Sequence, residues 1–109
     1  MAGEVRRGEI HLYGFRSPDK RRPVLVLTRS EVIPLLASVM VAPITTAVRG
    51  APSEVLVGVD EGLKTRSAVN LDHVQTVEQS RLGRYVGSVS AETMERVCKA
   101  LAIATGCDG

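Results

Sequence analysis

Residues 24–27 have the sequence Val-Leu-Val-Leu, and this run constrains the fold more than any other stretch. A short unbroken apolar run is typical of a strand covered on both faces, so we expect it inside a sheet. Pro23 precedes the run, and a proline at the first position of a strand disturbs no ladder hydrogen bond. Proline also disfavours the helical region for the residue before it, so Arg22 should be extended at the mouth of the strand. A guanidinium held on an extended, rigid backbone suits anion binding. The alternative is that the cations at 20–22 only keep the end of the strand in solvent.

The other expected elements are mostly strands. Alternating apolar and polar residues predict strands over 8–13 and 55–59, and a short strand over 84–88. A further strand is expected over 39–44, where Pro43 suggests an edge position or a bulge. Residues 67–77 are expected to be extended, with a bulge near His73, whereas 32–36 favour a short turn of helix.

One helix is expected, at the C-terminal end. Ser90 suits an N-cap position and Gly106 a C-terminal stop. Between them, Cys98 falls on the apolar stripe and is expected in the core. The full stripe is Met94, Val97, Cys98, Leu101 and Thr105. The predicted fold class is therefore mainly β with a C-terminal helix (α+β), a small, strongly bent antiparallel sheet or partial barrel, in one domain over residues 1–109.

Composition argues against several functions. Cys98 and Cys107 are too few for a disulfide framework, and His11 and His73 lack the spacing of metal ligands. The small aromatic content, 3%, argues against extensive base stacking. His11 is expected to be a surface histidine, and no Ser/His/Asp or Cys/His arrangement is apparent. No signal peptide or membrane-length apolar run is visible, so the cytoplasm is the expected compartment.

Arg22 and the Thr45–Thr46 pair are the remaining candidates for chemistry. Arg22 begins one predicted strand and Thr45 ends the next, so antiparallel pairing would bring them to one rim. A guanidinium fork and a hydroxyl suit a phosphodiester. Asn70 and Asp72 share a face of the later extended segment and can add polar contacts there.

A series of short motifs resembles the MazF/PemK toxins in order and over nearly the whole chain. The matching stretches are RGEI at 7–10, RRPVLV at 21–26, VAPITT at 41–46, RSAVNLD at 66–72, QTV at 75–77 and RLG at 81–83, followed by the closing helix. Any one of these motifs is weak, whereas the ordered series is specific.

This resemblance implies an SH3-like barrel of the MazF/CcdB type, a homodimer, and a metal-independent, sequence-specific endoribonuclease that needs no cofactor. Its substrate would be single-stranded RNA, cut by attack of the ribose 2′-OH to leave a 2′,3′-cyclic phosphate and a 5′-OH. A MazE-like antitoxin with an acidic, partly disordered tail would silence it. The family's catalytic arginine maps to Arg22 and its catalytic threonine to Thr45. The residues expected to contact RNA are Arg16, Lys20, Arg21, Thr46, Asn70 and Asp72.

Two departures from the family pattern limit this comparison. Residues 14–20 form a shorter loop than is common in the family, which leaves the general base open. Asn70 stands where one branch has an arginine, so an acid/base role for Asp72 does not carry over. Two other functions therefore stay open: a non-catalytic, CcdB-like gyrase-binding toxin, and a degenerate member that only titrates antitoxin.

Overall fold

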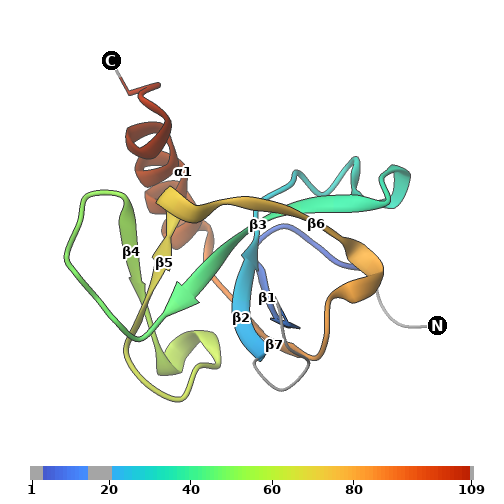
Figure 1. Ribbon diagram of the computed structural model, residues 1–109, viewed down its shortest axis with the longest axis horizontal. Coiled ribbons are helices and arrows are strands. Elements are labelled where there is room, and N and C mark those ends of the chain that lie inside the picture. The colour runs from blue at the N-terminus through green and yellow to red at the C-terminus, as the bar shows by residue number, and fades with distance from the viewer. Residues whose placement is uncertain (1–3, 15–20, 109) are drawn as a thin grey trace.

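The computed structural model describes residues 4–14 and 21–108, which form a bent antiparallel sheet closed at one end by a helix (Figure 1). The strands and the helix are β1 (Glu9–Gly14), β2 (Arg21–Val26), β3 (Ser38–Thr45), β4 (Glu54–Val57), β5 (Ser67–Asn70), β6 (Gln75–Glu78), β7 (Tyr85–Ser88) and α1 (Ala91–Thr105). Short 3₁₀ turns are η1 (Ile33–Leu35), η2 (Val59–Glu61), η3 (Leu71–His73) and η4 (Gln79–Arg81). The predicted class, mainly β with a C-terminal helix, is confirmed.

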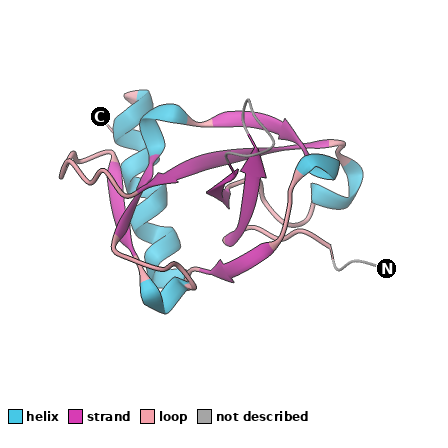
Figure 2. Cartoon of the chain, turned by 60° about the horizontal axis from the view of Figure 1, so that its bottom comes forward, coloured by secondary structure: helices cyan, strands magenta, loops and turns pink. Residues whose placement is uncertain are grey.

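The sheet has the strand order β4-β5-β3-β2-β1-β7, with β6 paired to β3 beside this path. Figure 2 shows the strands in magenta with the cyan helix across one end of the sheet. One edge of β3 pairs with β2 over its middle. The other edge pairs first with β6, up to Val41, and then with β5, from Ile44. Pro43 stands between these two ladders, where its missing N–H leaves no partner unsatisfied. The expected edge position was thus wrong, because β3 is the most central strand of the sheet.

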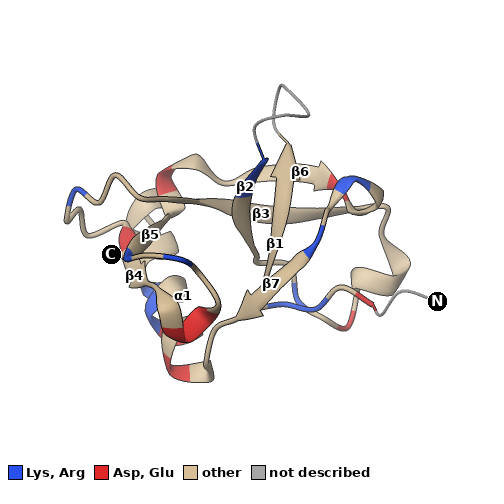
Figure 3. Cartoon of the chain, turned by 90° about the horizontal axis from the view of Figure 1, so that it is seen from below, with Lys and Arg blue, Asp and Glu red and all other residues tan. Residues whose placement is uncertain are grey.

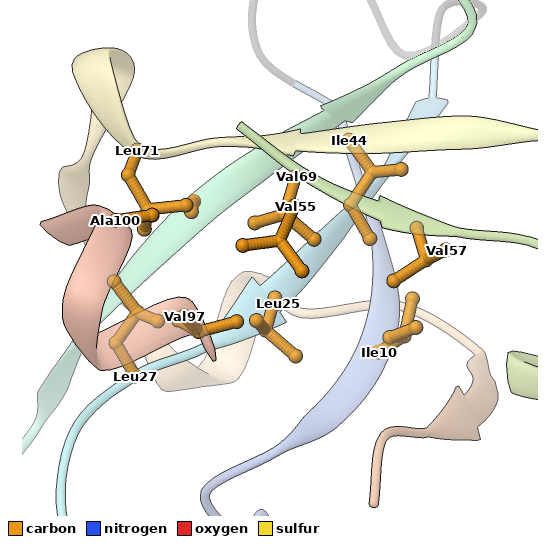
Figure 4. Packing of buried hydrophobic residues seen from close by; sticks show 11 residues of the cluster. Ile10, Leu25, Leu27, Ile44, Val55, Val57, Val69, Leu71, Val97 and Ala100 are labelled. Carbon is orange, nitrogen blue, oxygen red and sulfur yellow. The ribbon is translucent and has the colours of Figure 1, made fainter. Parts of the chain in front are cut away.

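Residues 24–27 contribute to the cores on both faces of the sheet. Leu25 and Leu27 belong to the cluster between the sheet and α1 (Figure 4). Val24 and Val26 belong to the cluster on the opposite face, with Tyr13 and η1. All four run residues are at most 3% exposed, which confirms the prediction of a strand covered on both sides.

Helix α1 begins and ends as predicted, but its buried stripe differs. Ser90 caps it by accepting a hydrogen bond from the N–H of Thr93, and Gly106 ends it with φ +76°. The buried residues of α1 are Thr93, Val97 and Ala100. Cys98 is exposed instead, and the Arg7 guanidinium donates to its Sγ at 3.1 Å, so the predicted core position was wrong. Within the described ranges, no helix has the length and apolar character that crossing a membrane requires.

The segment 67–77 is not one strand. Its middle is the 3₁₀ turn η3, stabilised by the Asn70 Oδ1, which accepts from the N–H of Asp72 at 3.0 Å. The predicted slip near His73 is therefore a turn that separates β5 from β6 rather than a bulge. The short helical turn expected over 32–36 is present as η1.

Candidate active site

Arg22 and Thr45 lie at the same end of the β2–β3 pair. The register sets Val24 opposite Pro43, and continuing it by two residues sets Arg22 opposite Thr45. Opposed residues on antiparallel strands point to the same face of a sheet. Arg22 is exposed and Thr45 half-buried, so both side chains are accessible at this end of the sheet, which we call the catalytic rim after the role proposed for it below. The antiparallel pairing of β2 with β3 that the sequence predicted is confirmed.

Tyr13 and Arg81 complete the surroundings of Arg22. Tyr13 is the register partner of Arg22 across β1 and β2, so the two share a face. The Arg81 guanidinium carbon lies 5.7 Å from the centroid of the Tyr13 ring, within the range of a cation–π contact. The 3₁₀ turn η4 thus brings a second arginine to the face of Arg22. Sequence reasoning had not singled out Arg81, because its position depends on how η4 packs against β1.

The Thr45 hydroxyl is held by the backbone that follows it. Its Oγ1 accepts a hydrogen bond from the N–H of Ala47 at 3.0 Å. A hydroxyl that accepts one bond still has its own proton to donate. The Thr45 hydroxyl is therefore held in place, and its O–H can donate a hydrogen bond to an anion at the catalytic rim.

Arg21 and Thr46 point to the other face of the sheet. Arg21 is opposite Gly14 in the ladder, one residue along from Arg22, and successive side chains of a strand alternate between faces. Together with Thr46 it lines a pocket of about 410 Å³ on the side of the sheet that carries α1. Arg21 and Arg22, which are adjacent in the sequence, thus lie on opposite faces of the sheet.

Asn70 and Asp72 are not brought to the catalytic rim together. The strand β5 pairs Ala68 with Thr45, so Asn70 lies farther along the same face. Asp72 lies beyond the end of β5, in η3, where its Oδ2 accepts from the Ser53 hydroxyl at 2.5 Å. The expected shared face of Asn70 and Asp72 is therefore absent, because η3 interrupts the strand. Two other expected RNA contacts, Arg16 and Lys20, lie outside the described residues.

His11 is a structural residue rather than the expected surface histidine. Only 9% of it is exposed, and its Nε2 lies 3.0 Å from the Glu9 Oε1. Its Nδ1 lies 3.3 Å from the carbonyl oxygen of Gly83, so both ring nitrogens have partners. The ring also contacts Tyr85 edge-on. His11 thus connects β1 to the segment before β7.

Cys107, outside any predicted site, is exposed in the turn that follows α1.

The part of the chain that the structure describes contains no group of three or more His, Cys, Asp or Glu side chains able to hold a metal ion. The described residues bring guanidinium and hydroxyl groups to the catalytic rim. Such groups bind phosphate oxygens and stabilise negative charge on them.

Comparison with known proteins agrees with this fold. Residues 6–105 match the family of PemK-like, MazF-like toxins of type II toxin–antitoxin systems. Over 83 residues the chain is 46% identical to Endoribonuclease MazF3 of Mycobacterium tuberculosis, with 76% of this chain and 81% of that relative covered. It is also 44% identical over 89 residues to the probable endoribonuclease MazF5 of the same species, covering 80% of this chain and 81% of the relative.

Two solved structures show the same architecture. The Mycobacterium tuberculosis toxin MazF-mt6 superposes with a TM-score of 0.83 at 42% identity, covering 90% of this chain and 96% of that one. A mycobacterial endoribonuclease in complex with its cognate antitoxin superposes with a TM-score of 0.83 at 28% identity, covering 94% and 95% of the two chains. With the family match over residues 6–105 and these similar proteins together, this chain belongs to the PemK-like, MazF-like toxins of type II toxin–antitoxin systems.

Proposed function

We propose that this toxin is an endoribonuclease that cuts single-stranded RNA at specific sequences without a metal ion or cofactor. The observation that carries the proposal is the β2–β3 register, which sets Arg22 and Thr45 on one face at an accessible rim. The names of the similar proteins, endoribonucleases MazF3 and MazF5, support the same reaction class. The expected place of action is the cytoplasm, where the RNA substrate is found.

The proposed reaction is an internal transesterification. The ribose 2′-oxygen attacks the adjacent phosphorus, and the bond from phosphorus to the 5′-oxygen breaks. The products are a 2′,3′-cyclic phosphate and a 5′-OH end. The 2′-OH loses its proton as it attacks, and the leaving 5′-oxygen gains one proton. The structure leaves the group that accepts the 2′-OH proton unassigned.

Arg22 is proposed to stabilise the negative charge that develops on the phosphorane. An arginine stays protonated at neutral pH, so it is a poor proton acceptor but a strong fork of donors to non-bridging oxygens. Pro23 restrains the backbone that carries the guanidinium to an extended conformation, which favours a preorganised donor. Thr45 is proposed to donate its O–H to a non-bridging oxygen of the same phosphate, and any proton transfer from Arg22 to the leaving oxygen is secondary.

We further propose two protein partners. A cognate antitoxin with an acidic, partly disordered tail would compete with RNA for the cations at the rim; a similar endoribonuclease has been solved with its cognate antitoxin. The second partner is another copy of the chain. Exposed apolar side chains at Leu35, Leu36 and Met40 support a homodimer, because exposed apolar patches of this kind mark interaction sites.

The test is incubation of the purified protein with total RNA in EDTA, followed by mapping of new 5′-OH ends. Defined cuts that disappear in Arg22→Ala would support the proposal. If the wild type makes no defined cuts, the chain is a binding toxin or an inactive member of the family. If Arg22→Ala cuts as well as the wild type does, the proposed role of Arg22 is wrong even though the activity is right.

A further inference from the structure

The pocket that Arg21 and Thr46 line, which we call the basic pocket, has the composition of a nucleotide site. It holds about 410 Å³, within the range of small-molecule sites. Its cations are Arg21, Lys64 and Arg84, and its hydroxyls are Thr46, Thr65 and Ser67. Leu12, Pro23, Leu63 and Val86 give it apolar walls. Cations and hydroxyls bind a phosphate, while apolar walls accept the faces of a ribose and a base.

The three cations come from separate parts of the chain and converge without an acidic partner. Arg21 begins β2, Lys64 follows η2, and Arg84 precedes β7. No Asp or Glu lines the pocket, and within residues 4–14 and 21–108 none of the three cations forms an ion pair. Figure 3 shows basic segments at the start of β2 and before β7, and acidic segments near α1, beside β6 and towards the N-terminal end. The positive charge of the pocket is therefore available to an anionic ligand.

Close backbone packing fixes the wall that carries Lys64. Gly62 has φ +92°, and a Cβ there would lie 2.4 Å from the carbonyl oxygen of Val86. From the other side, a Cβ on Gly87 would lie 2.0 Å from the carbonyl oxygen of Glu61. An approach this close requires glycine on both segments. The segment after η2 is thus held against β7, which places Lys64 and Arg84 around one cavity before any ligand arrives.

The basic pocket is continuous with the catalytic rim. Arg21 directly precedes Arg22 on β2, and Thr46 directly follows Thr45 at the end of β3. One residue of each pair lies at the catalytic rim, and the other lines the pocket. A strand of RNA held at Arg22 and Thr45 needs to pass only over the adjacent ends of β2 and β3 to reach the pocket. An acidic peptide would also be attracted by the charge, but its side chains need neither the apolar walls nor this adjacency.

We propose that the basic pocket binds one nucleotide of the substrate RNA next to the cut site, with its phosphate held by Arg21, Lys64 and Arg84. This inference rests on the proposed endoribonuclease function and adds to it a second binding subsite. The pocket lies to one side of the catalytic rim, so it contacts the RNA on one side of the cut only. It therefore contributes to binding and to the choice of sequence rather than to the bond-breaking step.

The experiment uses the full chain and a short single-stranded RNA spanning a cut site mapped with the wild type. Replacing the 2′-OH at that site by hydrogen removes the nucleophile, so binding is measured without cleavage. The double variant Lys64→Gln/Arg84→Gln is compared with Lys99→Gln, which removes a cation from α1 outside the pocket. Binding is followed over a range of salt concentrations, and thermal unfolding checks that each variant is folded.

We expect the double variant to bind about tenfold more weakly, since both substitutions remove a cation that holds the same phosphate. For single strands, each neutralised phosphate adds about 0.7 to the steepness of log K against log salt, so losing the contacts to this one phosphate should make the slope shallower by up to about 0.7. Lys99→Gln should change neither quantity. The defect should disappear when the RNA is shortened on one side of the cut and persist when it is shortened on the other.

An unchanged salt slope, or a defect that survives shortening from both sides, would overturn the subsite. So would a double variant that binds RNA normally but has a weaker affinity for an acidic peptide such as poly-glutamate. These results differ from failure of the proposed function, in which the wild type itself would neither cut the parent RNA nor bind the deoxy-substituted one. Wild-type cutting that depends on Arg22, combined with normal RNA binding by the double variant, would leave the function intact and remove only the pocket.

Discussion

Arg22 on β2 and Thr45 on β3 share one face at the same end of the sheet, although twenty-two residues separate them in the chain. Their relation is set by the ladder between Val24–Pro43 and Val26–Val41, whose valines on this face are fully buried. Because buried strands resist displacement, the rim keeps its geometry without help from a ligand. Catalytic groups of this kind act through preorganisation rather than through mobility.

Arg22→Ala is expected to lower the single-turnover rate of RNA cleavage by about 10²–10³, the usual effect of removing one preorganised donor to a developing oxyanion. Arg22→Lys should recover part of this rate, because a lysine restores the charge but not the two-pronged donor geometry. The measurement is the cleavage rate at saturating enzyme. Lys99→Ala, which removes a cation from α1, is the control; an equally slow rate there would mean that overall charge is responsible.

Thr45→Ala is expected to reduce the cleavage rate about 10-fold or more, whereas Thr45→Ser should stay close to the wild type, because it keeps the hydroxyl. The alanine variant also lacks the acceptor for the N–H of Ala47, at a cost of about 1 kcal/mol in the free energy of unfolding. Urea denaturation measured beside the kinetics separates the two effects. If Thr45→Ser were as slow as Thr45→Ala, the hydroxyl would have no part in catalysis.

Gly62→Ala and Gly50→Ala form a matched pair for the wall of the basic pocket. Both glycines have positive φ, so each alanine introduces backbone strain of about 1–2 kcal/mol. A Cβ on Gly50 would meet no atom within 4 Å, whereas a Cβ on Gly62 would meet the Val86 carbonyl oxygen at 2.4 Å. Gly62→Ala should therefore reduce the free energy of unfolding by about 1–3 kcal/mol more than Gly50→Ala does. Equal destabilisation in urea denaturation would show that Gly62 and Val86 are not packed together.

Leu35→Glu is expected to shift the proposed homodimer toward monomer in sedimentation velocity. Leu35 is 81% exposed and shares a surface pocket with Leu36 and Met40, so a charge placed there would be buried unpaired in an interface. The control is Leu56→Glu, on β4, where the leucine is 53% exposed and lies outside this pocket. A wild type that sediments as a monomer at micromolar concentration would contradict the dimer itself.

The sequence alone was sufficient to predict the strand that is buried on both faces and the two ends of the helix. The apolar run at 24–27 predicted β2 because few other environments accommodate four consecutive large apolar residues. Ser90 and Gly106 predicted the ends of α1 because capping depends on local hydrogen bonds and on a left-handed residue. The Arg22–Thr45 relation followed from the same strands, since antiparallel pairing alone brings a strand start beside the next strand's end.

The errors arose where tertiary packing decides. Cys98 was expected in the core because the stripe was judged by large apolar residues, whereas α1 packs against the sheet through Thr93, Val97 and Ala100. Asn70 and Asp72 are separated by the turn η3, in which the N–H of Asp72 donates to the Asn70 Oδ1 and the Ser53 hydroxyl donates to the Asp72 Oδ2. No alternation pattern reveals these hydrogen bonds. The convergence of Lys64 and Arg84 depends on the close packing of Gly62 against Val86, two segments with no sequence signal linking them.

The central place of β3 has a consequence for how this molecule folds. Since β2, β5 and β6 all pair with it, neither the α1-facing core nor the opposite core is complete until β3 is in place. We therefore expect its amides, with those of β2, to exchange with solvent only through global unfolding, while the β4 amides exchange through smaller openings. Thr45 ends this strand, so the proposed catalytic hydroxyl is attached to the part of the chain that is last to open.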